Sequence, residues 1–321
     1  MSTPVSPPPV IGSGYEGGIG DQVVNYFRRV RQGEMGALPA LGGFVVLIIL
    51  FSFLSGNFFT PLNLANLLTQ TATLMTLAMA LVFVILLGEI DLSAGVTSGV
   101  TASVFVVLVH NIQMNWILAL LIAFAVGMLI GTFIGFFVAR VGIPSFVVTL
   151  GLFLAIPGLQ LLIIGTGGAY RIETPEISAI MNKNLPIVTG WVLLGVAIAI
   201  DILISLWDRA RRRRAGVLNR PLTLMWARIG ALAVGGALFV ALMSVDRAAG
   251  RGSLNGVPIA HDAIEGVPIV VPIAVGLLWV GTFILDRTRY GRHLYAVGGN
   301  PEAARRAGIK VAGIKMSAFI V

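Results

Sequence analysis

No ionisable side chain occurs between Glu34 and Glu89. A membrane-spanning helix needs about 20 consecutive apolar residues, so this interval can hold two spans, which we predict at 37–56 and 65–87 with a turn at 57–63. The whole chain has the same character, because 57% of its 321 residues are hydrophobic and 11% are charged. Soluble domains carry about 25% charged residues. The sequence therefore predicts a protein that crosses a membrane several times.

The remaining apolar stretches predict six more spans, at 92–109, 116–138, 145–164, 188–207, 226–245 and 267–285. Pro157 predicts a kink in one of them, because proline removes a helical hydrogen bond. The segment 315–321 is typical of the first turns of a further helix. The expected fold class is an all-α polytopic integral membrane bundle of about eight complete spans plus the start of a ninth.

Lysine and arginine are distributed unequally between alternate loops. Eighteen of the 22 lie on the side that also holds the N-terminus. Since cytoplasmic loops are enriched in these residues, we predict a cytoplasmic N-terminus. The net charge of +8 has the same explanation and does not indicate nucleic acid. We divide the chain into a disordered tail (1–36), a transmembrane domain (37–285), a cytoplasmic segment (286–313) and the further helix (314–321). Two interpretations of residues 22–31 within the tail stay open: an amphipathic helix on the inner membrane surface, or a solvated segment.

A polar, basic segment, Thr288–Gly308, follows the last complete span. Gly298 and Gly299 predict a break in the chain, after which Asn300 is suited to cap a helix and Pro301 to begin it. Glu302 would lie near the positive end of the helix dipole, with Arg305 and Arg306 toward the negative end, and Gly308 would close the helix. The predicted helix has about two turns. One small, smooth side is formed by Ala303, Ala304 and Ala307.

A second motif, Gly88-Glu-Ile-Asp-Leu-Ser-Ala-Gly95, places two carboxylates between apolar helices. Carboxylates at a membrane are costly and commonly functional. Asp91 and Ser93 are suited to cap the next helix, the acids are suited to pair with arginines, and a proton relay is the least supported alternative. Asp201 is expected to pair with an arginine of the loop that follows it.

Polar residues recur at helical spacing in two apolar segments. Two interpretations stay open: a passage for a polyhydroxylated solute, or hydrogen bonds between helices, each worth about 0.6 kcal/mol. The candidates for the passage are Asn66, Thr69, Gln70, Thr73, Thr76 and Thr97. Gly127, Gly131 and Gly135 form a ridge of small residues, which predicts close helix packing.

The two motifs together resemble the permease subunits of bacterial ABC importers for ribose, xylose and related sugars. The resemblance implies a multi-pass inner-membrane protein that works with ATPase subunits, an extracytoplasmic sugar-binding protein and a second permease subunit, as a homodimer in contact with membrane lipid. It implies a signature turn at Gly88, Glu89, Asp91, Ser93 and Gly95. It also implies coupling to the ATPase through Gly291, Arg292, Tyr295, Ala296, Gly298, Asn300, Pro301, Glu302, Ala303, Ala304, Ala307 and Gly308.

Several chemistries find no support in the sequence. No G-x-x-x-x-G-K-[S/T] motif occurs, so we expect ATP to be bound by a partner subunit and no cofactor by this chain. There is no cysteine, and we identify neither a catalytic constellation nor a metal site. Two alternatives to the importer stay open: an ion-driven secondary transporter of small polar solutes, and a truncated membrane protein that does not transport. A pentose is the expected solute.

Overall fold

The computed structural model describes residues 28, 30, 33, 35–165, 170, 174–216, 222–247, 253–254, 257–258 and 263–321. The predicted tail 1–36 and its segment 22–31 lie almost wholly outside the described residues. The described part is helical, as expected, apart from one short antiparallel pair of strands, β1 (Ser253–Leu254) and β2 (Val257–Pro258).

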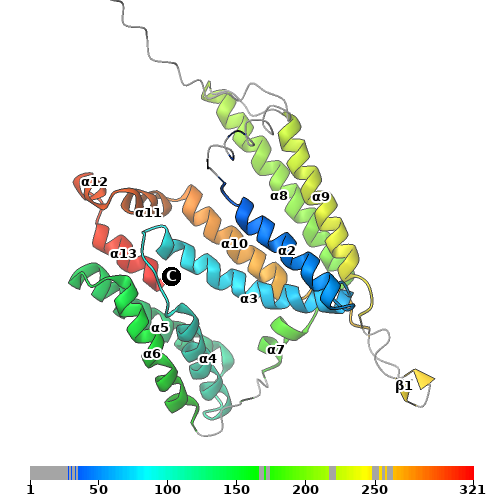
Figure 1. Ribbon diagram of the computed structural model, residues 1–321, viewed down its shortest axis with the longest axis horizontal. Helices are drawn as coiled ribbons and strands as arrows, with labels where there is room; N and C mark the ends of the chain where they lie inside the picture. Colours follow the sequence, from blue (N-terminus) through cyan, green and yellow to red (C-terminus); the bar gives the residue numbers. More distant parts are fainter. Residues whose placement is uncertain are drawn as a thin grey trace, which may run out of the picture. The chain divides into compact units, whose positions relative to one another are not determined.

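The helices follow the predicted apolar segments closely (Figure 1). Their bounds are α2 (Leu38–Leu54), α3 (Pro61–Ile85), α4 (Ala94–His110), α5 (Trp116–Phe136) with the π-helix η1 (Phe137–Val141), α6 (Ser145–Ile164), α7 (Pro175–Asn182), α8 (Ile187–Arg214), α9 (Leu222–Met243), α10 (Val270–Arg287), α11 (Arg289–Gly299), α12 (Pro301–Arg306) and α13 (Val311–Ile320).

Six of the described helices are long and apolar enough to cross a membrane. They are α3, α5 with η1, α6, α8, α9 and α10; α2, α4 and α13 are apolar but shorter. All eight predicted spans thus coincide with helices, and the span at 145–164 has the predicted limits. The polytopic helical class is confirmed. The short helices α7 and α11 were not predicted.

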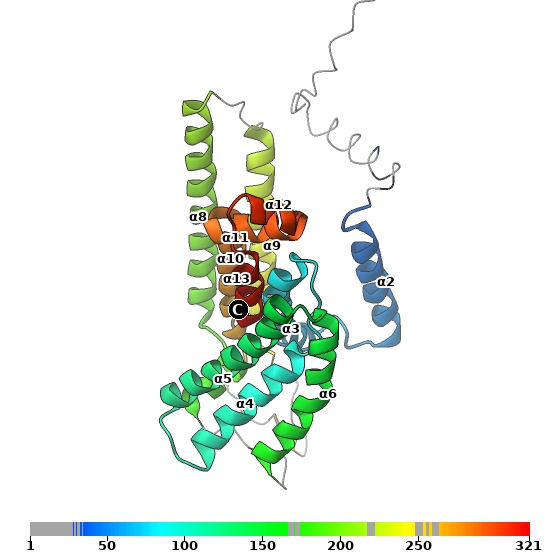
Figure 2. The same cartoon turned by 90° about the vertical axis from the view of Figure 1, so that its left-hand side faces the viewer.

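The chain divides into two compact units. Unit 1 consists of Met1–Leu64 and Leu185–Val267, and α8 and α9 lie side by side in it (Figures 1 and 2). The guanidinium of Arg228 lies 2.7 Å from a carboxylate oxygen of Asp201 and 2.7 Å from the hydroxyl of Ser205. The expected pairing of Asp201 with an arginine is confirmed, although Arg228 lies in α9 and not in the preceding loop.

Unit 2 consists of Ala65–Asn184 and Pro268–Val321. Its helices α4, α5 and α6 pack on one another (Figure 2), and α13 packs on α5. A Cβ atom on Gly131 would overlap the carbonyl oxygen of Phe319, and one on Gly135 would lie 2.9 Å from the Cα of Met316. Gly131 and Gly135 therefore permit the close packing that the sequence predicted, with α13 as the neighbouring helix, whereas a Cβ atom on Gly127 would lie 3.3 Å from the side chain of Thr101 in α4.

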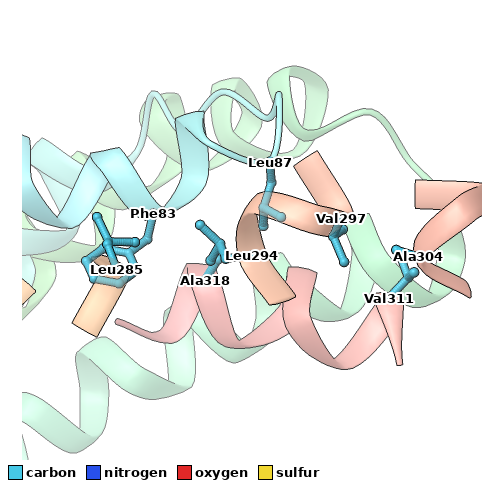
Figure 3. Packing of buried hydrophobic residues seen from close by; sticks show 8 residues of the cluster. All are labelled: Phe83, Leu87, Leu285, Leu294, Val297, Ala304, Val311 and Ala318. Carbon is cyan, nitrogen blue, oxygen red and sulfur yellow. The ribbon is translucent and has the colours of Figure 1, made fainter. Parts of the chain in front are cut away.

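One apolar core in unit 2 joins the end of α3 to the last four helices (Figure 3). It consists of Phe83, Leu87, Leu285, Leu294, Val297, Ala304, Val311 and Ala318. Leu294 and Val297 of α11 are completely buried. This core fixes the polar segment after α10 against the turn that follows α3, and these two segments are the two motifs of the sequence.

Candidate functional site

The predicted helix of the polar segment forms, with the predicted cap. Asn300 leaves the helical conformation at φ −157°, and its side-chain oxygen accepts a hydrogen bond from the N–H of Ala303 at 2.9 Å. Pro301 begins α12, and Gly308 follows it with φ +83°. Glu302 forms ion pairs with Arg305 at 3.0 Å and with Arg306 at 3.6 Å. These pairs are exposed and contribute little to stability, so the cap and the core hold α12 in place.

The expected break at Gly298 and Gly299 is wrong. Both residues belong to α11, and the chain breaks one residue later, at Asn300. Thr288 caps the start of α11, since its hydroxyl accepts a hydrogen bond from the N–H of Gly291 at 3.2 Å. The spacing of Tyr290, Leu294 and Val297 places apolar side chains on one face of the helix. Burial of that face outweighs the low helix propensity of two terminal glycines.

Two glycines of α11, Gly291 and Gly298, allow the helix to approach neighbouring backbone closely. A Cβ atom on Gly298 would overlap the carbonyl oxygen of Leu86, and one on Gly291 would overlap that of Leu285. α11 therefore lies directly on the turn after α3 and on the end of α10. Only a residue without a side chain permits this approach.

The residues proposed for coupling differ in exposure, and Gly298 among them is half-buried. Ala304 is buried beside Val297 and Val311 (Figure 3), and Gly291 is buried as well. The expectation that Ala304 forms part of a smooth outward side of α12 is thus wrong, because the core of unit 2 covers it. The exposed members are Arg292, Tyr295, Ala296, Asn300, Pro301, Glu302, Ala303, Ala307 and Gly308.

The acidic turn after α3 begins at Gly88, whose φ is +73°. Glu89 forms an ion pair with Lys315 of α13, and the two side chains are 14% and 24% exposed. The partner of Glu89 is therefore a lysine and not one of the expected arginines. The sequence analysis placed Lys315 in the further helix without predicting this pairing, although a single cation in an apolar helix signals the need for a partner.

Asp91 and Ser93 do not cap α4 in the expected way. Ser93 stands at the N-cap position without a capping bond, and its N–H and hydroxyl both donate to Asp91 at 2.7 Å. Asp91 thus fixes the turn just before the helix. Gly95, in the first turn of α4, has open space around its Cα.

The turn is also bound to α6. The N–H of Ile90 donates to the hydroxyl of Ser145 at 3.0 Å, and the hydroxyl of Thr149 donates to the carbonyl of Ile90 at 3.2 Å. Ser145 and Thr149 are both buried. Neither residue was a candidate from the sequence, because the pairing joins segments 55 and 59 residues apart.

Unit 2 contains a cavity of about 500 Å³ between α3, α4, α5 and α13. Its walls are mainly apolar, with a polar strip on the α4 side formed by Asp91, Thr97, Ser98 and Thr101. The hydroxyl oxygen of Thr97 is buried and has no hydrogen-bond partner among the described residues. This strip can offer carboxylate and hydroxyl oxygens to a polar solute.

The cavity receives only one of the residues predicted for a passage. Thr97 lines it, whereas Asn66, Thr69, Gln70, Thr73 and Thr76 do not. The hydroxyls of Thr69 and Thr76 donate to carbonyls one turn earlier in their own helix, each at 3.0 Å. The other three side chains are exposed. The polar residues of α3 and Thr97 of α4 are thus not brought together at this cavity.

The described residues contain no group of three or more His, Asp or Glu side chains that could hold a metal ion. The candidate site consists of the turn after α3, the helices α11 and α13 that contact this turn, and the cavity that Asp91 of the turn lines.

A family model described as "Branched-chain amino acid transport system / permease component" matches residues 63–321. The xylose transport system permease protein XylH of Escherichia coli (strain K12) is 31% identical over 286 residues, which cover 88% of this chain and 67% of that protein. The corresponding protein of Haemophilus influenzae is 28% identical over 86% of this chain and 69% of its own length.

The ribose import permease protein RbsC of Escherichia coli (strain K12) is 28% identical over 294 residues, which cover 92% of this chain and 67% of that protein. No solved structure matches at a significant level. The family match covers both motifs and every helix from α4 onward, and six of the described helices can cross a membrane. The chain therefore belongs to this family of transport permeases, as a multi-pass protein of the inner membrane.

Proposed function

We propose that this chain is the membrane-spanning permease subunit of an ATP-driven importer that moves a monosaccharide of the xylose or ribose kind into the cell. The similarity to xylose and ribose permeases supports the solute class. ATP would be hydrolysed by a separate ATPase subunit, since the chain has no phosphate-binding loop of its own. An extracytoplasmic binding protein would deliver the sugar, and a second permease subunit would complete the complex.

α12 is the contact with the ATPase in this proposal, and its geometry is the observation that carries it. The helix is capped at its start and anchored through Ala304, while its neighbours Ala303 and Ala307 face outward with Arg305 and Arg306. A short helix that is fixed on one side and exposed on the other can enter a groove of a partner and transmit the partner's movement. Such coupling requires a contact that differs between two states of the complex.

The polar strip of α4 is the proposed wall of the sugar pathway in this subunit. Sugars present many hydroxyl groups, and buried polar groups need hydrogen-bond partners. The unpartnered hydroxyl of Thr97, together with Ser98 and Thr101, would supply some of them. In this proposal the polar residues of α3 do not line the pathway and instead contact other helices or subunits.

The test uses exposed positions of α12, because substitutions at Gly298 or Ala304 would disturb the core of this subunit. Ala303→Trp or Ala307→Trp is expected to abolish co-purification of the ATPase subunit and ATP-dependent xylose uptake. Ala215→Trp, at the exposed end of α8, is the matched control and should retain both. Full retention in the α12 variants contradicts the docking role. Uptake that survives ATP depletion and stops when the ion gradient is dissipated would favour a secondary transporter instead.

A further inference from the structure

We propose that the turn Leu86–Ser93 is the joint through which movement of α12 reaches the helices around the cavity, and that Glu89 and Lys315 are positioning residues of this joint. The inference rests on the proposed function, since it specifies how the coupling segment acts on the pathway. It is carried by contacts that lie entirely within unit 2.

The first contact of the joint is rigid and carries movement of α11 to the turn. Gly298 lies directly on the carbonyl of Leu86, with no room for a side chain between them. Leu87 of the turn is buried in one core with Leu294 and Val297 of α11 (Figure 3). Packed cores shift between discrete arrangements and do not deform continuously, so α11 cannot move far while the turn stays in place.

The second contact carries movement of α13 to the same turn. α13 follows α12 after a short connection, in which the N–H of Ile309 donates to the carbonyl of Ala304 at 3.0 Å. Lys315 of α13 then pairs with Glu89 of the turn. Both side chains are mostly removed from solvent, so loss of one partner leaves the other charge without compensation. The pair therefore opposes separation of α13 from the turn.

On its other side the turn holds the beginnings of two helices. Ile90 is bound through its N–H and its carbonyl to Ser145 and Thr149, in the first two turns of α6. Asp91 is bound to Ser93, where α4 begins. Asp91 also lines the cavity, as does Thr97 in the first turn of α4. A displacement of the turn therefore moves the polar wall of the cavity.

The test separates coupling from stability by measuring xylose transported per ATP hydrolysed. It uses the complete complex, with ATPase subunits and binding protein, reconstituted in lipid vesicles. Glu89→Gln and Lys315→Gln are expected to lower this ratio about tenfold, within the usual range of allosteric coupling, while the ATPase still co-purifies. The charge exchange Glu89→Lys with Lys315→Glu should restore the ratio to within about threefold of wild type, and Lys315→Arg should retain it.

Arg213→Gln removes one exposed positive charge from the end of α8 in the other unit and serves as the control, with the wild-type ratio expected. An unchanged ratio in both single variants overturns the joint and leaves the proposed function intact. A charge-exchanged complex that assembles without recovering the ratio also overturns it, even where the single variants fail to accumulate. A wild-type complex without ATPase subunits or ATP-dependent uptake overturns the proposed function, and the joint with it.

Discussion

At the scale of single residues, Gly298 has the closest neighbour for an added Cβ among the glycines that the structure describes. A methyl group on its Cα would overlap the carbonyl oxygen of Leu86, whereas a Cβ on the next residue, Gly299, would meet nothing within 4 Å. The two glycines look alike in the sequence, and both suggested a break in the chain. Only the packing of α11 shows that one of them is required for contact and the other is not.

We therefore expect Gly298→Ala to destabilise the protein by about 1–3 kcal/mol, the usual cost of overpacking a core. Gly299→Ala, the matched control, should be neutral or stabilise the protein by up to about 1 kcal/mol, because alanine favours a helix more than glycine does. Thermal unfolding of the two variants in detergent checks this. Equal unfolding temperatures for both would show that α11 does not lie against the turn as described.

Tyr290 gives a prediction for alkaline pH. Burial in α11 raises the pKa of its hydroxyl, and the hydrogen bond with Ser317 at 3.1 Å partly opposes this shift. Because the folded state holds the proton more tightly, the associated stability is present below the ordinary pKa of about 10 and is lost as the pH rises through the raised value. Between about pH 9 and 11, the unfolding temperature of the Tyr290→Phe variant should therefore fall less than that of the wild type. If the unfolding temperature of the variant falls as steeply as that of the wild type, Tyr290 is not the source of the pH dependence.

At the scale of helices, α13 packs closely against the glycine ridge of α5. The sequence predicted close packing at Gly127, Gly131 and Gly135 but not its partner. In the structure Phe319 and Met316 of α13 lie over the last two. The same helix carries Lys315 to Glu89, so the ridge also fixes one side of the proposed joint.

Gly131→Val should displace α13 and lower the unfolding temperature, since its side chain would overlap the backbone at Phe319. The cost is expected to be at least about 1–3 kcal/mol. Gly151→Val in α6 is the matched control, because a Cβ there meets nothing within 4 Å; only its helix propensity changes. Comparable stability of the two variants, measured by thermal unfolding, would contradict the packing of α13 on α5.

At the scale of the whole molecule, the distribution of Lys and Arg predicts the orientation in the membrane. The chain contains no cysteine, so single cysteines can report on it directly. In intact cells a membrane-impermeant thiol reagent should label Lys183→Cys and leave Arg212→Cys and Arg305→Cys unlabelled until the membrane is permeabilised. The cysteine-free wild type is the control. Labelling of Arg305→Cys from outside would place α12 on the wrong side for an ATPase and would refute the importer.

Much of this protein follows from the sequence alone, for a simple reason. A helix in a membrane must satisfy its own backbone hydrogen bonds and expose apolar side chains, so the eight apolar stretches predicted eight helices. The cap at Asn300 and the left-handed Gly308 were predictable for a different reason, because a helix end depends on the few residues next to it.

The contacts between helices required the tertiary structure. The burial of Ala304, the pairing of Glu89 with Lys315 and the attachment of Ile90 to α6 join residues that hydropathy cannot relate to one another. Apolar helices offer many similar faces to one another, and the difference between correct and incorrect neighbours lies in a few small residues and polar pairs. The sequence determined where the helices lie along the chain, and the tertiary structure decided which of them share a turn.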